Sequence, residues 1–289
     1  MRQLRLVHYL MLTPAQALVT LALAGPALYV ACLSFTTSDF GRNIQFVGLD
    51  NYRKILSDRY FWQAALNTFL VVNFVVYAEL ALGLGAAKLV AGVQRGRTLL
   101  FSIVLAPYAI SEVVAVLSWR FLADPRFGLI SRTLESIGLP QLDWTSDPNV
   151  ALGLIATISV WLHLPFSFVL LYAAIISVPR EIVEAAHIDG ATPFQEFWRV
   201  TLPIITPAAI ITIVFRYIFA FRMFSEVWLV TQGGPIRSTE VLGTYLYRAG
   251  FRYSDYGGAA AVGWLMVLGS ALLAIFYIHA MYRRMFRFD

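Results

Sequence analysis

The sequence predicts an all-α membrane protein with six transmembrane helices. Of its 289 residues, 59% are hydrophobic and only 13% are charged, whereas soluble domains carry about 25% charged residues. The mean hydropathy is +0.69, and the apolar residues gather in runs of the ~20 residues needed to cross a bilayer. The net charge of +5 does not indicate nucleic-acid binding, because the basic residues lie around these runs and form no stripe.

The six predicted spans form one transmembrane domain over residues 1–289, with approximate bounds 12–35, 64–87, 98–117, 150–178, 207–230 and 257–281. The first run follows Arg2 and Arg5 as in a signal peptide, but it stays apolar to Phe35, so we expect an uncleaved span. The fourth run is longer than a ~30 Å hydrocarbon core requires, which predicts a tilt or a kink at Pro165. Six spans place both termini on one side. The loop Lys and Arg residues divide evenly between the two sides, and the basic residues that directly flank the span ends favour cytoplasmic termini only weakly.

Two loops and the lone cysteine carry weaker signals. Asp50 and Asn51 precede YRKIL and predict a capped short helix. Residues 128–139 alternate apolar and polar side chains at helical spacing. Cys32 lies inside an apolar run, so we expect a packing residue and no disulfide within the chain.

A polar segment, EAAHIDGATPFQEFWRVTLP at residues 184–203, separates the fourth and fifth spans. Pro179 suits the first position of a helix, and Gly190 can adopt the left-handed conformation that ends one. Thr192 and Gln195 have capping-box spacing, and Pro203 stops or bends the chain. The pattern predicts a helix–turn–helix over 179–206 whose apolar residues dock against a partner. The alternative is an amphipathic helix lying on the lipid headgroups.

The same segment resembles the EAA loop of ABC importer permeases. The matching positions are Glu184, Ala185, Ala186, Gly190, Val200, Leu202 and Pro203. Residues 48–56, 67–69, 105–130, 160–161, 165–166, 215–235 and 239–251 are similar to the carbohydrate-uptake (maltose/glycerol-phosphate-like) branch of type I importers. One departure is Phe224-Ser225, where that branch often has Phe-Asp.

This resemblance implies a type I permease fold in the bacterial inner membrane, with both termini cytoplasmic. It implies a cytoplasmic coupling helix that docks into an ATPase subunit, formed by Glu184, Ala185, Ala186, Asp189, Gly190, Ala191, Phe194, Phe197, Leu202 and Pro203. It also implies that an external turn contacts a solute-binding protein through Gln232, Gly233, Gly234 and Pro235. The implied partners are a second homologous permease, two cytoplasmic ATPase subunits, an extracellular or periplasmic solute-binding protein and membrane lipid.

Polar and aromatic residues within or beside the spans are candidates for the translocation path. Intramembrane charges usually face the bundle interior or a cavity, and sugars bind through hydrogen bonds and aromatic stacking. The candidates are Glu79, Glu112, Trp119, Trp161, His163, Arg216, Tyr217, Arg222, Glu226 and Trp228. Arg222 and Glu226 are four residues apart on one face of the fifth span, so their non-binding interpretation is mutual neutralisation or a structural bond to the partner permease. For each candidate, ordinary packing is the alternative. An arginine pair would suit an anionic sugar, although the surrounding pattern resembles that of the branch in general.

Signatures of catalysis are missing from the sequence. There is no G-x-x-x-x-G-K-[ST] phosphate-binding loop and no H-E-x-x-H or G-x-S-x-G motif. His163 has no second ligand at metal-binding spacing. We therefore expect no cofactor, metal or catalysis in this chain, with ATP and Mg²⁺ bound by the ATPase subunits. The predicted function is permease subunit of an ATP-driven importer for a sugar or sugar derivative. An ion-coupled secondary transporter is the alternative, although the expected internal repeats are not apparent, and a membrane-embedded enzyme lacks its catalytic groups.

Overall fold

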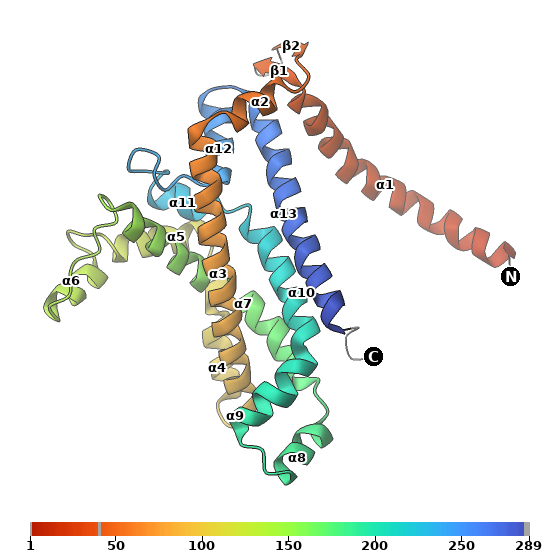
Figure 1. The fold of residues 1–289 in the computed structure, drawn as a ribbon, viewed down its shortest axis with the longest axis vertical. Coiled ribbons are helices and arrows are strands. Elements are labelled where there is room, and N and C mark those ends of the chain that lie inside the picture. The colour runs from red at the N-terminus through yellow and green to blue at the C-terminus, as the bar shows by residue number, and fades with distance from the viewer. Residues whose placement is uncertain (1, 40–41, 286–289) are drawn as a thin grey trace. The chain divides into compact units, whose positions relative to one another are not determined.

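The computed structural model describes residues 2–39 and 42–285, and it describes the side chains of residues 12–38 and 44–279. The chain forms two compact units: unit 1 is Met1–Arg59 with Tyr245–Val267, and unit 2 is Tyr60–Thr244 with Leu268–Asp289. The boundary between them falls within three helices: after the first residue of α3 (Arg59–Gly92), within α12 (Leu242–Tyr247) and within α13 (Tyr256–Met285) (Figure 1).

Unit 1 joins a long helix to a β-hairpin and a short helix. It contains α1 (Arg2–Ser34), β1 (Thr36–Asp39), β2 (Arg42–Phe46), α2 (Asp50–Leu56), the π-helix η3 (Arg248–Arg252) and the start of α13. The strands are antiparallel, with Thr36 opposite Phe46. The Asn51 amide donates to the Ser34 and Thr36 carbonyl oxygens at 2.8 and 2.9 Å. Asn51 thus ties α2 to the α1–β1 junction.

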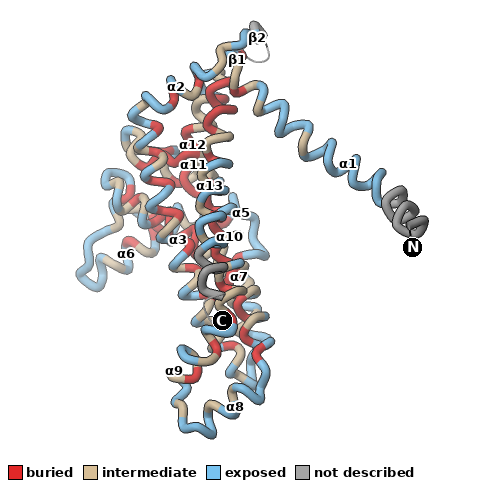
Figure 2. Tube along the Cα trace, turned by 45° about the vertical axis from the view of Figure 1, so that its right-hand side comes forward, coloured by how far each residue is buried: buried red, intermediate tan, exposed pale blue. Residues whose placement is uncertain are grey.

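Two expectations for unit 1 are wrong. The N-cap of α2 is Leu49, and no side chain caps the helix, because the Asn51 side chain is committed to the α1–β1 junction. Cys32 is exposed rather than packed. Its helix is exposed along most of its described length, as the pale blue tube of α1 in Figure 2 shows.

Unit 2 is a helical bundle built around one central helix. It contains α3 (Arg59–Gly92), α4 (Arg97–Leu105), the 3₁₀ turn η1 (Ala106–Ala109), α5 (Glu112–Leu122), α6 (Leu129–Ser136), α7 (Pro148–Ile176), α8 (Arg180–Ile188), α9 (Pro193–Glu196), the π-helix η2 (Phe197–Thr201), α10 (Leu202–Ala220), α11 (Ser225–Val230) and the end of α13. Helix α7 contributes to two buried apolar clusters. Ile155 and Ile158 pack with residues of α3, α5 and α11, and Phe168 packs with residues of α3 and α10. The apolar sequence of α7 is therefore explained by burial from several sides.

Five helices of the described chain are long and apolar enough to cross a membrane: Leu12–Ser34, Arg59–Gly92, Pro148–Ile176, Pro193–Ala220 and Tyr256–His279. Arg97–Ala109 and Glu112–Leu122, which meet at a bend of 97°, make a sixth span when they are counted as one broken element. This predominantly helical arrangement, with one short β-hairpin, confirms the predicted fold class. Pro165 lies inside α7 and does not end it.

Two of the predicted spans are discontinuous. The third breaks where Pro107 opens a 3₁₀ turn and Ile110 adopts extended backbone angles, φ −110° and ψ 138°. The fifth is interrupted because α10 ends at Ala220 and α11 begins at Ser225. Both breaks lie beside α7, and they are central to the site described below.

Gly83 lies where α3 and α7 approach closely. A Cβ placed on Gly83 would be 3.2 Å from the Ser167 Cβ and from the Phe168 backbone nitrogen, whereas one on Gly85 meets nothing within 4 Å. We expect Gly83→Val to lower the free energy of unfolding by about 1–3 kcal/mol relative to Gly85→Val, because the added methyl groups overpack the contact. Thermal unfolding of the two purified variants measures this difference. Equal melting temperatures would contradict the close packing of α3 against α7.

Candidate functional site

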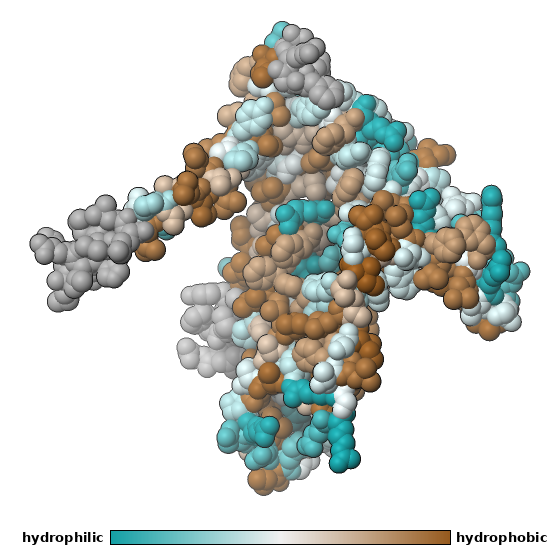
Figure 3. Space-filling view, turned by 180° about the vertical axis from the view of Figure 1, so that it is seen from behind, coloured by the Kyte–Doolittle hydropathy of each residue, from teal (hydrophilic) through white to brown (hydrophobic). Residues whose placement is uncertain are grey.

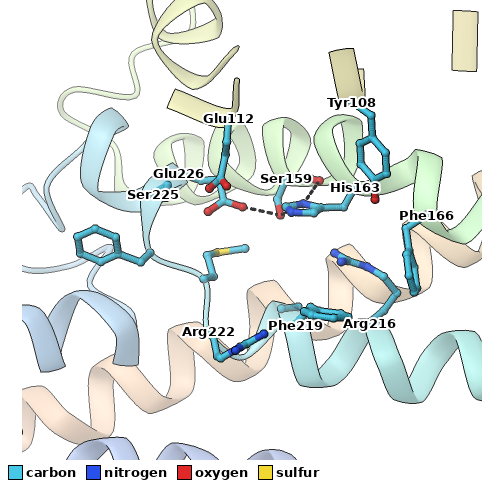
Figure 4. A pocket seen from close by; sticks show the side chains of 13 residues that line it. Tyr108, Glu112, Ser159, His163, Phe166, Arg216, Phe219, Arg222, Ser225 and Glu226 are labelled. Atoms are coloured by element: carbon cyan, nitrogen blue, oxygen red, sulfur yellow. Dashed lines mark hydrogen bonds between the residues drawn. The ribbon is translucent and has the colours of Figure 1, made fainter. Parts of the chain in front are cut away.

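A cavity of about 470 Å³ opens among the two broken segments and α7. It is lined by Tyr108, Glu112, Ser159, His163, Phe166, Arg216, Phe219, Ala220, Arg222, Met223, Phe224, Ser225 and Glu226. Figure 4 shows Arg222, Phe219 and Arg216 along one side and Glu112, Glu226, Ser159 and His163 along the other. The lining thus places charged, hydroxyl and aromatic groups inside an otherwise apolar bundle.

The breaks in the helices explain why the cavity is here. Residues 221–224 connect α10 to α11 without continuing the helix, and residues 110–111 separate η1 from α5. Non-helical backbone at membrane depth is tolerated where it lines a cavity or is buried in protein. Arg222, Met223 and Phe224 of the first break line the cavity, and Tyr108 and Glu112 line it on either side of the second. The irregular segments therefore lie where irregular backbone is least costly.

A buried ion pair supports one side of the cavity. The Arg216 Nη2 donates to Glu79 Oε1 at 2.8 Å, and Arg216 Nε donates to Glu79 Oε2. The side chains are 4% and 0% exposed, respectively. Arg216 lines the cavity from α10, whereas Glu79 lies behind it on α3. The positive charge of Arg216 at the cavity wall is therefore already neutralised by Glu79.

The opposite side is held by hydrogen bonds from α7. The Ser159 hydroxyl donates to Glu226 Oε1 at 3.0 Å. His163 Nδ1 lies 2.9 Å from the Ser159 carbonyl oxygen, so Nδ1 donates to it, and in the neutral ring Nε2 is an acceptor. Glu112 is exposed at the start of α5. This side therefore presents mainly acceptors.

The expected pairing of Arg222 with Glu226 is wrong. Because α10 ends at Ala220, the two residues do not share a helical face. Glu226 bonds Ser159 instead, and the Arg222 guanidinium carbon lies 5.4 Å from the centre of the Phe219 ring. The ion pairs of the described residues do not include Arg222.

Half of the predicted path residues line this cavity, and the others pack elsewhere. The lining members are Glu112, His163, Arg216, Arg222 and Glu226. Trp119 and Trp161 meet edge to face at 5.7 Å, and Trp228 stacks on Phe224 at 5.8 Å. The Tyr217 hydroxyl donates to Asn73 Oδ1 at 2.5 Å. These four residues, and Glu79 behind Arg216, do not line the cavity.

Sequence reasoning missed eight lining residues, namely Tyr108, Ser159, Phe166, Phe219, Ala220, Met223, Phe224 and Ser225. Four of them had a usable signal. Ser159 and Phe166 are each one helical turn from His163 on α7, and Phe219 and Ala220 are each one turn after Arg216 on α10, so each shares a face with a predicted candidate. The other four lie in or beside the helix breaks, which hydropathy does not reveal.

The turn at 232–235 is held by local hydrogen bonds. Gln232 and Gly233 have φ values of 53° and 85°. The Thr239 hydroxyl donates to the Gly234 carbonyl oxygen at 2.6 Å. The Thr239 backbone N–H donates to the Gly233 carbonyl oxygen at 3.1 Å. Gln232 is exposed and Gly233 is buried.

The polar segment forms the predicted helix–turn–helix, which we call the α8–α9 hairpin (residues 180–203). Gly190 has φ +84°. The Gly190 N–H donates to the His187 carbonyl oxygen at 3.0 Å, and the Ala191 N–H donates to the Ala186 carbonyl oxygen at 2.9 Å. This is a Schellman end to α8. The capping box of Thr192 and Gln195 is also confirmed. Pro179 is the residue before α8 rather than its first residue.

The hairpin exposes apolar side chains. Ile188, Phe194 and Trp198 are 86%, 73% and 51% exposed. Of the predicted coupling residues, Glu184, Ala185, Asp189, Gly190, Phe194 and Pro203 are exposed, and Ala186, Ala191, Phe197 and Leu202 are half-buried. Figure 3 shows hydrophilic residues gathered at the lower end, where Figure 1 places α8 and α9. Apolar groups exposed within a polar surface are typical of a docking site.

A family model described as "binding-protein-dependent transport system inner membrane component" matches residues 79–287. The chain belongs to this family. It is 35% identical over 264 residues to the sn-glycerol-3-phosphate transport system permease protein UgpA of Escherichia coli O6:K15:H31 (strain 536 / UPEC), covering 89% of this chain and 88% of the relative. The corresponding protein of Salmonella typhimurium (strain LT2) is 34% identical over 261 residues, covering 89% of this chain and 88% of that relative.

A solved structure with a similar fold is that of a bacterial alginate ABC transporter in complex with an alginate pentasaccharide-bound periplasmic protein. The TM-score is 0.84 at 24% identity, covering 98% of this chain and 96% of that one. These similarities confirm the predicted permease family and the type I permease fold. The protein is thus an inner-membrane permease subunit of an ABC importer.

The Glu79–Arg216 pair makes a testable contribution to stability. We expect Glu79→Met or Arg216→Met alone to cost about 3–5 kcal/mol, because each leaves a buried charge without a partner. The double variant should be more stable than either single variant, because neither charge remains. Melting temperatures of the purified proteins give the comparison, with Arg222→Met as a control that changes stability by less than about 0.5 kcal/mol. If the double variant lost as much stability as the two single variants combined, the pairing would be contradicted.

Proposed function

We propose that this permease forms, with a second permease subunit, the translocation path for a sugar or sugar derivative. The observation that carries the proposal is the cavity of about 470 Å³ at the two helix breaks, with polar and aromatic groups on facing sides. Ion-coupled transport is the alternative, and the first experiment below separates the two.

The chemistry of the lining suits a ligand rich in hydroxyl groups. Glu112 and Glu226 accept hydrogen bonds, Arg222 donates them, and Phe219 offers an apolar face. A sugar hydroxyl both donates and accepts, and the C–H face of a sugar ring packs on aromatic rings. Because Arg216 is matched by Glu79, Arg222 is the cation left to offset two carboxylates, which favours a neutral ligand over a strongly anionic one.

The relatives broaden the substrate class. The UgpA proteins are named for sn-glycerol-3-phosphate, and the similar solved structure belongs to an alginate transporter. A polyhydroxylated chain or ring is common to both. We therefore propose a sugar or polyol derivative, with its hydroxyl-bearing part in this cavity.

Energy reaches the protein through the α8–α9 hairpin in this proposal. Its exposed Ile188 and Phe194 dock into a cleft of a cytoplasmic ATPase subunit, and the exposed Glu184 pairs there with a basic residue. Charge-assisted hydrogen bonds hold a contact in one geometry better than apolar surface alone. ATP and Mg²⁺ bind to two ATPase subunits, and a solute-binding protein contacts the turn at 232–235 on the external side.

The orientation follows from the position of the hairpin. It joins the fourth and fifth spans, so it lies on the same side as the N-terminus if six spans cross the membrane. A cytoplasmic hairpin then places both termini in the cytoplasm. Rocking of the spans about the cavity, driven by closure of the ATPases, gives alternating access.

The coupling role is tested by Glu184→Lys in proteoliposomes that contain the complete importer. Wild-type protein should import labelled sugars only with ATP. The variant should lose import while ATP hydrolysis continues, because like charges now meet at the ATPase contact. Glu135→Lys, an exposed charge reversal on α6, is the control and should import normally. Import without ATPase or ATP would instead support ion-coupled transport.

The cavity is tested by replacing one of two similar phenylalanines. Phe219 and Phe215 are one turn apart on α10 and 45% and 47% exposed, but only Phe219 is among the cavity-lining residues. We expect Phe219→Ala to weaken apparent substrate affinity by about 1 kcal/mol, roughly fivefold, the size of one aromatic contact. Phe215→Ala should leave it unchanged. The concentration dependence of import, with maltose and sn-glycerol-3-phosphate as neutral and anionic probes, measures both. Equal effects of the two variants would place the ligand elsewhere.

A further inference from the structure

A second ion pair, buried on its carboxylate side, lies at the base of the α8–α9 hairpin. Lys88, near the end of α3, has its Nζ 2.7 Å from Oε2 of Glu196, the last residue of α9. The Glu196 side chain is 3% exposed and that of Lys88 is 39% exposed. The other carboxylate oxygen of Glu196 accepts from the Thr201 hydroxyl in η2. Both oxygens of a buried carboxylate are therefore bound, one by α3 and one by the chain that leads into α10.

The two partners belong to long helical segments. Residues Pro193–Ala220 form one apolar helical stretch of 28 residues that includes α9, η2 and α10. Helix α3 extends over 34 residues, and no proline lies inside it. Force applied at one end of α3 is therefore carried along it, because an α-helix resists bending except at a proline, a π-bulge or an inserted group. The segment Pro193–Ala220 contains η2, Pro203 and Pro207, so α3 is the stiffer of the two.

The same two segments are joined a second time beside the cavity. Arg216 on α10 pairs with Glu79 on α3, and Lys88 on α3 pairs with Glu196. Glu79 and Lys88 are nine residues apart, so about 13 Å of α3 separates the two connections. One connection lies at the hairpin and the other carries a residue of the cavity wall.

We propose that Lys88 and Glu196 are positioning residues that transmit hairpin movement to the cavity wall. The inference rests on the proposed coupling role of the hairpin. If the hairpin shifts, Glu196 either takes Lys88 and α3 with it or becomes a buried charge without its partner. The second outcome is costly, so α3 follows. Because Glu79 on α3 is paired with Arg216 on α10, movement of α3 then displaces α10 at the cavity.

The π-helix η2 lies next to the Lys88–Glu196 ion pair. It begins directly after Glu196, and Thr201 is its last residue. A π-helical turn inside an α-helix occurs frequently at functional sites. Here it marks the junction between the hairpin and the span. The Lys88 Nζ also lies 5.4 Å from the centre of the Phe197 ring in η2, so α3 holds both sides of this junction.

The test measures cavity movement directly and requires no substrate. In the complete importer with Cys32→Ser, nitroxide labels attached to Ser118→Cys on α5 and Phe215→Cys on α10 report the distance between these two helices. In the wild-type background, ATP with Mg²⁺ should shift this distance. With Glu196→Gln or Lys88→Met, the population of molecules that show the ATP-dependent distance should fall on the order of tenfold, a usual size for coupling between two sites. ATP hydrolysis should continue.

Two controls separate transmission from stability. The reversed pair, Lys88→Glu with Glu196→Lys, should restore the shift. Lys54→Met breaks an ion pair of similar length, 3.0 Å to Asp255, in which Lys54 is 75% exposed, and it should leave the shift intact. A wild-type shift in Glu196→Gln would overturn the proposal. So would failure of the single and reversed variants to assemble with the ATPases, because the pair would then serve folding. Absence of any ATP-dependent shift in the wild-type background would instead refute the coupling role of the hairpin.

Discussion

The cost of leaving a charge unpaired in a low-dielectric interior organises this protein. Glu79 and Arg216 are both almost fully buried, and each is acceptable there only because the other is within hydrogen-bond distance. Their pairing fixes α3 against α10. It also neutralises the arginine that faces the cavity, which leaves hydrogen-bonding groups available without a large net charge. The chemistry open to a ligand follows from this internal pairing.

Backbone hydrogen bonding imposes the second constraint. A helix that stops inside a bilayer leaves N–H and C=O groups that lipid cannot satisfy. Within the described residues, two apolar segments are interrupted in this way, at residues 110–111 and 221–224, and both interruptions border the same cavity. A polar cavity tolerates broken helices, and broken helices supply polar groups to a cavity. The two features therefore support each other, and neither is expected alone in an apolar bundle.

The sequence predicted what hydropathy and local capping determine. The helical membrane class, the Schellman end at Gly190 and the capping box at Thr192 depend on a few neighbouring residues, and all three are confirmed. The pairing of Arg222 with Glu226 was predicted wrongly because it assumed a continuous fifth span. Nothing within four residues of Ala220 signals a helix end as a proline or glycine would. Likewise, Glu79 and Arg216 are 137 residues apart, so their contact depends on tertiary packing that spacing along the chain does not reveal.

The hairpin illustrates how local structure prepares a surface for binding. Its turn is fixed by hydrogen bonds within residues 186–195, and its base is fixed by Lys88 and Glu196. The exposed Ile188, Phe194 and Trp198 are therefore held on a backbone that is already ordered. Binding to such a surface avoids most of the entropy cost of ordering a flexible loop. A rigid hairpin also passes displacement onward instead of absorbing it, so the features that favour docking are the ones that coupling to the membrane helices requires.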